Sequence, residues 1–243
     1  MVTPANAFVR KIKAYGLLAD GDVRRLVEAS DPPRKIAAHR DLIREGDKPS
    51  VLFVILEGWA CRYKVLPDGN RQIMAFLMPG DFCDVHAGEL EEMDHSIGTL
   101  TPCLIVTVPR RDVEALVIST PALTRAFWRA QLIDEGVLRA WIVSMGRRNA
   151  LERVAHLMLE LYARMRNVGL TTDHSCELPL TQVVLGDALG LTSVHVNRVL
   201  RELRQQGIME LGARTLRILD IIALGKIAGF DDNYLHRKIG KVA

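Results

Sequence analysis

The chain has 243 residues, 49% of them hydrophobic and 25% charged, with a formal net charge of +3. This length fits one large domain or two modest ones, and this composition argues against extended disorder and low-complexity chains. The longest purely apolar run, residues 51–56, is far shorter than the roughly 20 residues of a membrane span. The first residues lack the apolar core of a secretory signal, so we expect a cytoplasmic protein.

The N-terminal part of the chain changes texture near residue 30. Residues 8–29 carry apolar side chains at helical spacing, interrupted by Gly16 and Gly21, which predicts short helices. From 34 to 108, short runs rich in Val, Ile, Phe and Tyr alternate with Gly-, Pro- and Asp-containing turns. Such spacing predicts an antiparallel sandwich or barrel. Its clearest hairpin joins 59–65 to 71–77 through a turn containing Gly69.

A long helix is predicted after the strands. Thr120 is a suitable N-cap, Pro121 suits a first helical turn, and apolar residues recur at helical spacing to residue 145. The apolar face is broad, so we predict that part of it forms a coiled-coil-like dimer seam; an ordinary core helix is the alternative. The predicted interface comprises Leu123, Phe127, Ala130, Asp134, Val137 and Trp141.

The helix breaks at residues 146–149, where we place a domain boundary. A second amphipathic helix is predicted over 150–166, and a polar loop follows over 167–177. From residue 147 onward there are 14 Lys and Arg against 10 Asp and Glu, compared with 18 against 19 before it. This basic surplus is compatible with nucleic-acid binding, although many solvated surfaces share it.

Residues 180–219 contain the most informative pattern. Thr181 is a candidate N-cap for a helix that ends at Gly190, and Thr192 can cap a second helix over 193–205. Two short helices joined by a tight turn containing glycine indicate a helix-turn-helix. Two short strands, 208–211 and 215–219, then form a predicted wing with Arg214 at its tip, where it can meet a phosphate.

The second helix has one apolar face and one face suited to DNA. Arg198 can donate two hydrogen bonds to guanine, Asn197 or Gln205 can pair with adenine, and Val194 can contact a thymine methyl. A plain solvated face, the alternative, would show more glutamate and no valine. The predicted DNA-binding residues are Thr181, Thr192, Ser193, Val194, His195, Asn197, Arg198, Arg201, Gln205 and Arg214.

This order of elements resembles the Crp/Fnr superfamily of bacterial transcription regulators, most specifically over residues 180–211, LTQVVLGDALGLTSVHVNRVLRELRQQGIMEL. The resemblance implies an α+β fold with a β-roll of the cyclic-nucleotide-binding kind over 1–118, a dimerisation helix over 119–146 and a winged helix-turn-helix over 147–243. It also implies a homodimer on a two-fold symmetric operator of double-stranded DNA, and contact with RNA polymerase.

The recognition helix matches the family only in part. Arg198 falls where the family has its base-reading arginine, and Asn197 falls where anaerobic-type members often have serine. Val194 stands where many members have glutamate, so an acidic acceptor for a cytosine amine is missing.

The sensor half departs further from the family. Members that bind cyclic AMP carry a Gly-Glu pair and an Arg-Ser pair, which the family spacing places here on Asp84-Val85 and His95-Ser96. Of these pocket positions only Ser96 is retained, so we do not expect cyclic AMP to bind. A shifted alignment over 88–90 supplies the glutamate but no following arginine.

The positions of the cysteines and histidines limit which cofactors the chain could hold. The chain has no cysteine before Cys61 and no C-x-x-C pair, which argues against an iron–sulfur cluster. A haem or metal site from Cys83, His86 and His95 is an alternative, with polar loop residues as the simpler interpretation. The four cysteines, Cys61, Cys83, Cys103 and Cys176, are expected to be inert thiols, with redox sensing as the alternative.

A cupin-like metalloenzyme and a ligand-binding module without DNA binding are the two alternatives to a DNA-binding regulator. A cupin-like metalloenzyme would need histidines at fixed spacing on facing strands, which His39, His86 and His95 do not offer. A ligand-binding module that has lost DNA binding would not need the intact outward face of 193–205. We therefore expect a regulator and not an enzyme.

Overall fold

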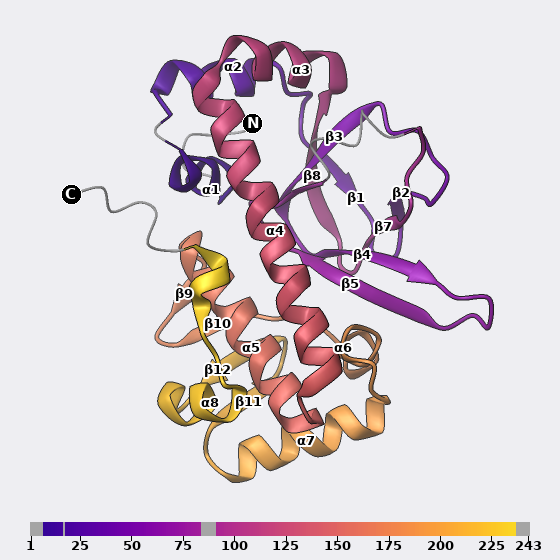
Figure 1. The fold of residues 1–243 in the computed structure, drawn as a ribbon, viewed down its shortest axis with the longest axis vertical. Coiled ribbons are helices and arrows are strands. Elements are labelled where there is room, and N and C mark those ends of the chain that lie inside the picture. The colour runs from indigo at the N-terminus through magenta and orange to yellow at the C-terminus, as the bar shows by residue number, and fades with distance from the viewer. Residues whose placement is uncertain (1–6, 17, 84–90, 237–243) are drawn as a thin grey trace. The chain divides into compact units, whose positions relative to one another are not determined.

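The computed structural model describes residues 7–16, 18–83 and 91–236. The chain has the α+β composition predicted from the sequence and divides into two compact units (Figure 1). Of the described residues, the first unit holds those between 7 and 69 together with those between 74 and 134, and the second holds 70–73 together with 135–236.

The first unit is built on two four-stranded antiparallel sheets, ordered β1-β8-β3-β6 and β2-β7-β4-β5. The predicted hairpin is present as β4 and β5, and Gly69 in its turn has φ +85°, which suits a residue without a Cβ. The strands are β1 (Arg34–Ile36), β2 (Asp41–Ile43), β3 (Val51–Glu57), β4 (Ala60–Val65), β5 (Arg71–Leu77), β6 (Phe82–Cys83), β7 (Ser96–Thr99) and β8 (Cys103–Pro109).

Strand β3 explains why residues 51–56 are apolar without interruption. Successive strand side chains point to opposite faces of a sheet. Leu52 and Val54 belong to a buried cluster formed with the helices, whereas Phe53 and Ile55 belong to a second cluster inside the roll. Because both faces of β3 are buried, neither face requires polar residues.

Helices cover the outer face of this sheet. They are α1 (Ala7–Tyr15), α2 (Asp20–Glu28), α3 (Arg110–Ser119) and the first half of α4 (Pro121–Arg147). The rings of Phe8, Phe82 and Phe127 form a chain of edge-to-face contacts, with centroid distances of 6.0 and 5.4 Å. These contacts join α1, β6 and α4, and edge-to-face packing adds to the burial of each ring. Short helices were predicted over 8–29, and the sequence pattern becomes helical after Pro109, where α3 begins.

Four of the six residues of the predicted dimer seam on α4 are buried within the single chain. Leu123, Phe127, Ala130 and Val137 are at most 4% exposed within a single chain. The first three pack with the helices and sheet of the first unit, and Val137 packs in the second. The broad apolar face of α4 is therefore covered by the chain itself.

The remaining two predicted interface residues also have partners within the chain. The Arg62 Nη1 lies 3.3 Å from the Asp134 Oδ2, an ion pair between β4 and α4. The Trp141 Nε1–H donates to the carboxylate of Glu160 on α5. Because Val137 and Trp141 pack in the second unit, the chain divides within α4, between Asp134 and Glu135, and not at the predicted boundary after residue 146.

The second unit combines four further α-helices and a short 3-10 helix with a small sheet ordered β11-β12-β10-β9. The helices are α5 (Ala150–Asn167), α6 (Gln182–Leu189), α7 (Ser193–Gln205), α8 (Ile221–Ala228) and the 3-10 helix η2 (Asp232–Leu235). The strands are β9 (Thr171–Thr172), β10 (Ser175–Glu177), β11 (Met209–Gly212) and β12 (Thr215–Ile218). The predicted polar loop over 167–177 thus contains β9 and β10.

A buried acid lies in the middle of the second unit. The Glu160 side chain is fully buried and accepts hydrogen bonds from Trp141 Nε1 and Tyr234 Oη, each at 3.1 Å, while Arg164 Nη1 lies 3.5 Å away. Burial raises the pKa of Glu160, and these donors act in the opposite direction. We call Glu160, Trp141, Tyr234 and Arg164 the Glu160 cluster. It ties α4, α5 and η2 together.

Candidate nucleic-acid interface

The helix-turn-helix forms as predicted, and local chemistry explains its shape. The hydroxyl of Thr181 accepts from Val184 N–H and caps α6, while Gly190 ends that helix with φ +63°. Gly186 allows the close return of the chain: a Cβ there would lie 2.5 Å from the carbonyl oxygen of Leu191. A side chain at this position would push the turn away from α6.

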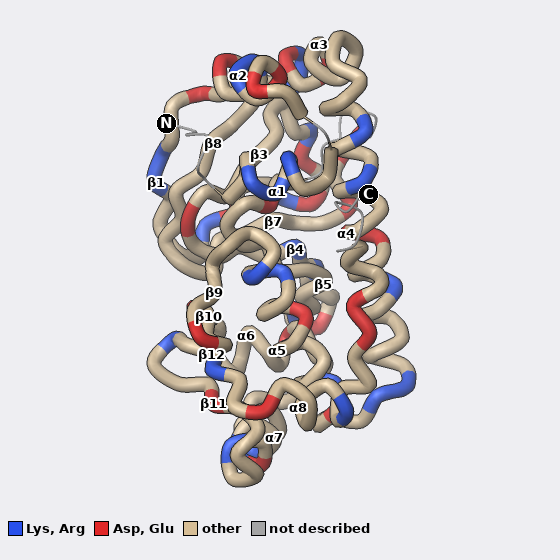
Figure 2. Tube along the Cα trace, turned by 90° about the vertical axis from the view of Figure 1, so that its left-hand side faces the viewer, with Lys and Arg blue, Asp and Glu red and all other residues tan. Residues whose placement is uncertain are grey.

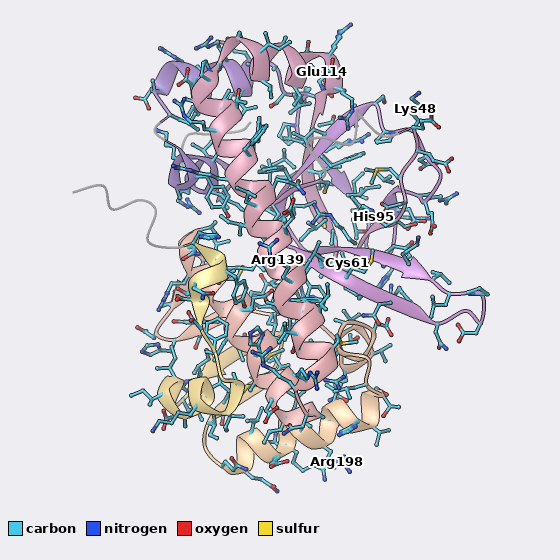
Figure 3. All side chains as sticks on the ribbon, in the orientation of Figure 1. Lys48, Cys61, His95, Glu114, Arg139 and Arg198 are labelled. Atoms are coloured by element: carbon cyan, nitrogen blue, oxygen red, sulfur yellow. The ribbon has the colours of Figure 1, made fainter. Side chains whose placement is uncertain are left out.

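Helix α7 is the candidate recognition helix. The hydroxyl of Thr192 accepts from His195 N–H at 3.2 Å and caps its first turn. Val196, Val199 and Leu203 are buried, as the amphipathic pattern predicts. Arg198 therefore projects from the opposite side of α7, away from the helices that pack against α7 (Figure 3). Among the described residues, Arg198 has no ion-pair partner.

The other predicted DNA-binding residues of α7 lie around Arg198. Val194, Arg201 and Gln205 are exposed, whereas Ser193, His195 and Asn197 are half-buried. Figure 2 shows the charged residues of this helix. The Arg201 Nη2 donates to the Asn197 Oδ1 at 3.1 Å, one helical turn away. In this structure the Asn197 oxygen, which the sequence analysis predicted could pair with adenine, accepts a hydrogen bond from Arg201 instead.

The wing is present as β11 and β12. Its turn uses Ala213 and Arg214 at φ +48° and +64°, a conformation uncommon for residues other than glycine. The Arg214 Nη2 lies 3.1 Å from the Glu177 Oε1, and both side chains are more than 60% exposed. Glu177 lies on β10, so β10 gives the predicted phosphate-binding arginine a competing partner that sequence reasoning missed.

A groove of about 640 Å³ runs between the helix-turn-helix and the wing. Its lining mixes backbone, hydroxyl and guanidinium groups, including Thr181, Gln182, Ser193 and Arg214. Thr181 lies at the N-terminus of α6 and Ser193 at that of α7, where amide groups favour anions. The rest of the lining is mainly apolar and includes Leu180, Val183 and Leu200, so the polar groups of the groove are confined to these two helix N-termini and the wing.

The predicted effector-pocket residues fall into two groups. Asp84 and Val85, as well as His86, lie outside the described residues. The His95 Nδ1 lies 2.6 Å from the Asp94 Oδ1, and this contact lowers the pKa of Asp94. The Ser96 Oγ accepts from Glu45 N–H at 3.0 Å. His95 and Ser96 thus both take part in hydrogen bonds of the roll itself.

The four cysteines are free thiols and all are buried. Burial raises the pKa of Cys103, and it raises that of Cys176 to about 11. A thiolate is the reactive form of cysteine, so both environments suppress reactivity. Within residues 7–16, 18–83 and 91–236, no three His, Cys, Asp or Glu side chains gather into a potential metal site, and no helix is long and apolar enough to cross a membrane.

A second feature that sequence reasoning missed is an exposed apolar stripe on α4. Trp128, Leu132 and Ile142 are 62%, 51% and 71% exposed. They follow a spacing of four and ten residues, so they lie along one side of the helix. The spacing of these residues is present in the sequence. It could not be singled out because other residues of α4, including those of the predicted interface, are also apolar at helical spacing.

Comparison with known proteins agrees with this architecture. Residues 33–120 match the cyclic nucleotide-binding domain, and residues 152–227 match the Crp-like helix-turn-helix domain. The first match spans the β-roll, and the second spans α6, α7 and the wing.

Relatives match over most of their length. A "Probable transcriptional activator" of Rhizobium leguminosarum is 32% identical over 81% of this chain and 80% of its own. "Nitrogen fixation regulation protein FixK" of Bradyrhizobium diazoefficiens is 30% identical over 90% of this chain and 93% of its own. The structure of FixK2 from Bradyrhizobium japonicum superposes with a TM-score of 0.73 at 25% identity, covering 82% of this chain and 98% of that one. The chain belongs to the Crp/Fnr family of DNA-binding transcription regulators.

Proposed function

We propose that the chain acts as a homodimer that places one α7 in each of two successive major grooves of a two-fold symmetric operator. The observation that carries this proposal is α7 itself, which is capped by Thr192, buried on one side and arginine-bearing on the other. Recognition helices of this kind read base edges from the major groove, and dimers bind half-sites about one helical turn apart. The chain then regulates transcription by binding DNA and not by catalysing a reaction.

The exposed stripe of α4 is the proposed dimer surface, in place of the face expected from the sequence. Trp128, Leu132 and Ile142 share this stripe with Glu135 and Arg139, which form an exposed ion pair at 3.4 Å. The five positions alternate at spacings of four and three, which suits a parallel helix pair, although Glu135 and Arg139 take two of the inner positions. Charged residues within such a stripe can fix its register.

Charge on this stripe tests the assembly. We expect the double variant Trp128→Glu, Ile142→Glu to be monomeric by light scattering and to bind operator DNA poorly. Ile118→Glu is the matched control, because Ile118 is 83% exposed on α3, away from the stripe. A wild-type monomer at micromolar concentration would contradict the proposal. Ala130→Glu is unsuitable, because Ala130 is buried within the chain.

Arg198 is proposed to read a guanine in each half-site, and Arg214 to hold the DNA backbone. A bidentate arginine–guanine contact gives about 1–3 kcal/mol of discrimination. Binding-site selection should show Arg198→Ala losing its preference at one base pair of each half-site. Arg214→Ala should weaken all sequences alike and lower the salt slope by about one for each phosphate that the arginine neutralises. Unchanged selection by Arg198→Ala would remove α7 from the readout.

We also propose that the regulator works in the cytoplasm and activates transcription by contacting RNA polymerase. The support is the naming of its relatives, among which the Rhizobium leguminosarum protein is described as a probable transcriptional activator. Transcription from an operator-bearing promoter, reconstituted with bacterial RNA polymerase, checks this point. We expect the full-length dimer to raise transcript yield; a fall in yield would assign repression instead.

The β-roll is proposed to act without cyclic AMP or cyclic GMP. The family spacing offers no arginine for the cyclic phosphate, and Arg62 is paired with Asp134. A buried phosphate that lacks a cationic partner is poorly compensated. Calorimetric titration of cyclic AMP to millimolar concentration should show no saturable binding and no change in operator affinity. An absorption spectrum and elemental analysis test the remaining alternative, a sensor containing haem or metal.

A further inference from the structure

Residues 229–236, which we call the strap, follow α8 and include η2. The strap lies against α5 at the end of the described chain (Figure 1). It also comes close to α4, because a Cβ at Gly136 would lie 2.9 Å from the carbonyl oxygen of Tyr234. Glycine inside a helix is unfavourable, and this close approach of a second backbone explains its presence in the middle of α4.

Ring contacts and a hydrogen bond hold the strap on α5. The ring of His156 stacks on Tyr234 with centroids 6.0 Å apart and meets the edge of Phe230 at 5.2 Å. The Tyr234 Oη donates to the buried carboxylate of Glu160, which also accepts from Trp141 of α4. The strap therefore bridges α4 and α5 through its backbone and through its side chains.

A second junction between α4 and α5 is the short connection at Arg148 and Asn149. Asn149 caps α5, and the Arg148 Nε donates to the carbonyl of Ala228, at the end of α8 that leads into the strap. The stretch of α4 from Gly136 to Arg147 is about 16 Å long at the usual rise of an α-helix. A short connection alone can act as a hinge, whereas two attachments this far apart hold the angle between the helices.

The angle between α4 and α5 matters for DNA binding because each helix carries one part of the proposed machinery. Helix α4 bears the proposed dimer stripe, and α5 packs against the recognition helix α7. We propose that the strap fixes this angle and thereby sets the half-site spacing that the dimer accepts. The inference rests on the proposed function, because it requires one dimer to hold two α7 helices on one operator.

The distance between the two attachments shows why a small displacement has a large effect. A shift of about 1 Å at Gly136, acting over about 16 Å, turns α5 by about 4°. One added base pair moves a half-site by about 3.4 Å and turns it by about 36°. A dimer with a fixed angle should reject such a change, and a dimer whose strap is detached should tolerate it better.

The experiment detaches the strap and measures spacing preference. Gly136→Leu places a side chain where the strap lies. Operators carry the selected half-sites at the wild-type spacing or with one base pair added or removed. We expect the ratio of affinities for wild-type and altered spacing to fall about fivefold or more, as is typical when coupling between two parts is lost. Partial unfolding lowers affinity for every spacing alike, so it leaves this ratio unchanged.

Other properties of the Gly136→Leu protein should persist. Light scattering should still show a dimer, and base preference within each half-site should match wild type. Gly146→Leu is the matched control on the same helix, because a Cβ at Gly146 meets nothing within 4 Å; it should keep the wild-type ratio. Tyr234→Phe keeps the ring on His156 and removes the hydroxyl that donates to Glu160, so it should lower the ratio by less.

The outcomes separate this inference from the proposed function. A wild-type ratio in both Gly136→Leu and Tyr234→Phe would overturn the role of the strap and leave the proposed function standing. If Gly136→Leu does not fold, Tyr234→Phe alone decides. An equal fall in Gly146→Leu would assign the effect to bulk on α4 and also overturn the inference. A wild-type protein that accepts every spacing equally would refute the proposed two-fold binding, and this inference with it.

Discussion

Lys11 and Arg62 of the β-roll and Arg198 of the winged helix differ in where their side chains point. In the first unit, Lys11 pairs with Asp81 and Arg62 pairs with Asp134, and each pair joins two elements of the fold. In the second unit, Arg198 points outward without an ion-pair partner among the described residues. A charge paired inside a unit is explained by the fold itself. A charge left at the surface on a capped, well-packed helix is accessible to a partner outside the chain, in line with the proposed function.

The Glu160 cluster shows what the outward-facing helix rests on. Helix α5 carries Glu160 and also packs against α7 and α8. The interior of the second unit is thus fixed by buried polar contacts, while its outer helix remains available for binding. Four predictions test whether changes in the interior alter stability while changes on the surface of α7 alter DNA binding.

The largest effect is expected at Glu160. Replacing it with alanine leaves Arg164, Trp141 and Tyr234 without their buried acceptor. Breaking a buried ion pair by removing one partner typically costs about 3–5 kcal/mol. We expect a loss of this size in the free energy of unfolding from chemical denaturation. Glu160→Gln, which keeps one acceptor oxygen, should lose less; equal stability of the alanine variant and wild type would contradict the role of the cluster.

Protonation of His156 should destabilise the same unit. Burial, with Arg148 nearby, lowers the pKa of His156 from 6.5 to about 4. The folded state therefore favours neutral His156, so its contribution is fully present above pH 6.5 and is lost as the pH falls toward 4. This shift corresponds to about 3 kcal/mol. Glu160, whose pKa is raised, acts in the opposite direction.

Comparing His156→Phe with wild type isolates this effect. His156 stacks on Tyr234 and meets the edge of Phe230, so phenylalanine suits its surroundings. Denaturation midpoints measured from pH 7.5 to 4.5 should fall less steeply for the variant. Parallel curves for the two proteins would assign the acid sensitivity to other groups.

Two glycines of the second unit form a matched pair. A Cβ at Gly186 would lie 2.5 Å from the Leu191 carbonyl oxygen, whereas a Cβ at Gly225 in α8 meets nothing within 4 Å. Gly186→Ala should cost about 1–3 kcal/mol through overpacking and should also weaken DNA binding. Gly225→Ala should be neutral or stabilise by up to about 1 kcal/mol. Thermal denaturation measures the stability of both variants. Equal changes in stability would contradict the predicted steric clash at Gly186.

The smallest change in stability is expected when the paired Arg62 and the outward-facing Arg198 are each replaced by alanine. Arg62 is 13% exposed and Asp134 is 29% exposed, so Arg62→Ala should cost about 1 kcal/mol of stability and leave base preference unchanged. Arg198→Ala should change stability by less than about 0.5 kcal/mol and lose base preference. Unfolding measurements and binding-site selection on the same two proteins give the comparison. It would collapse if Arg62→Ala altered the selected sequence.

The parts of the fold that could be predicted from the sequence are those specified by local signals. Thr181, Gly190 and Thr192 each favour one backbone conformation, and together they define the helix-turn-helix. Strands β9 and β10 carry no such signal, because they are short and are stabilised by pairing: β9 pairs with β10, and β10 pairs with β12. Their detection requires knowing which distant segment lies beside them.

The row of α4 that the chain buries against itself could not be predicted for a related reason. Helical periodicity identifies apolar rows on α4, but it does not tell which row the chain buries against itself. The pairing of Arg62 with Asp134, 72 residues apart in sequence, is equally invisible to local pattern. Sequence pattern alone therefore places Asp134 in the predicted dimer interface, whereas the structure pairs it with Arg62 of the same chain.

The burial of all four cysteines gives the protein a set of internal reporters. Cys61, Cys83 and Cys103 lie in the first unit and Cys176 lies in the second. A thiol-modifying reagent can reach each sulfur only when the surrounding structure opens, because the folded state shields it. Modification kinetics resolved by peptide mass spectrometry would therefore measure how often each unit opens. The natural chain permits this measurement in both units at once, with or without DNA, and needs no engineered label.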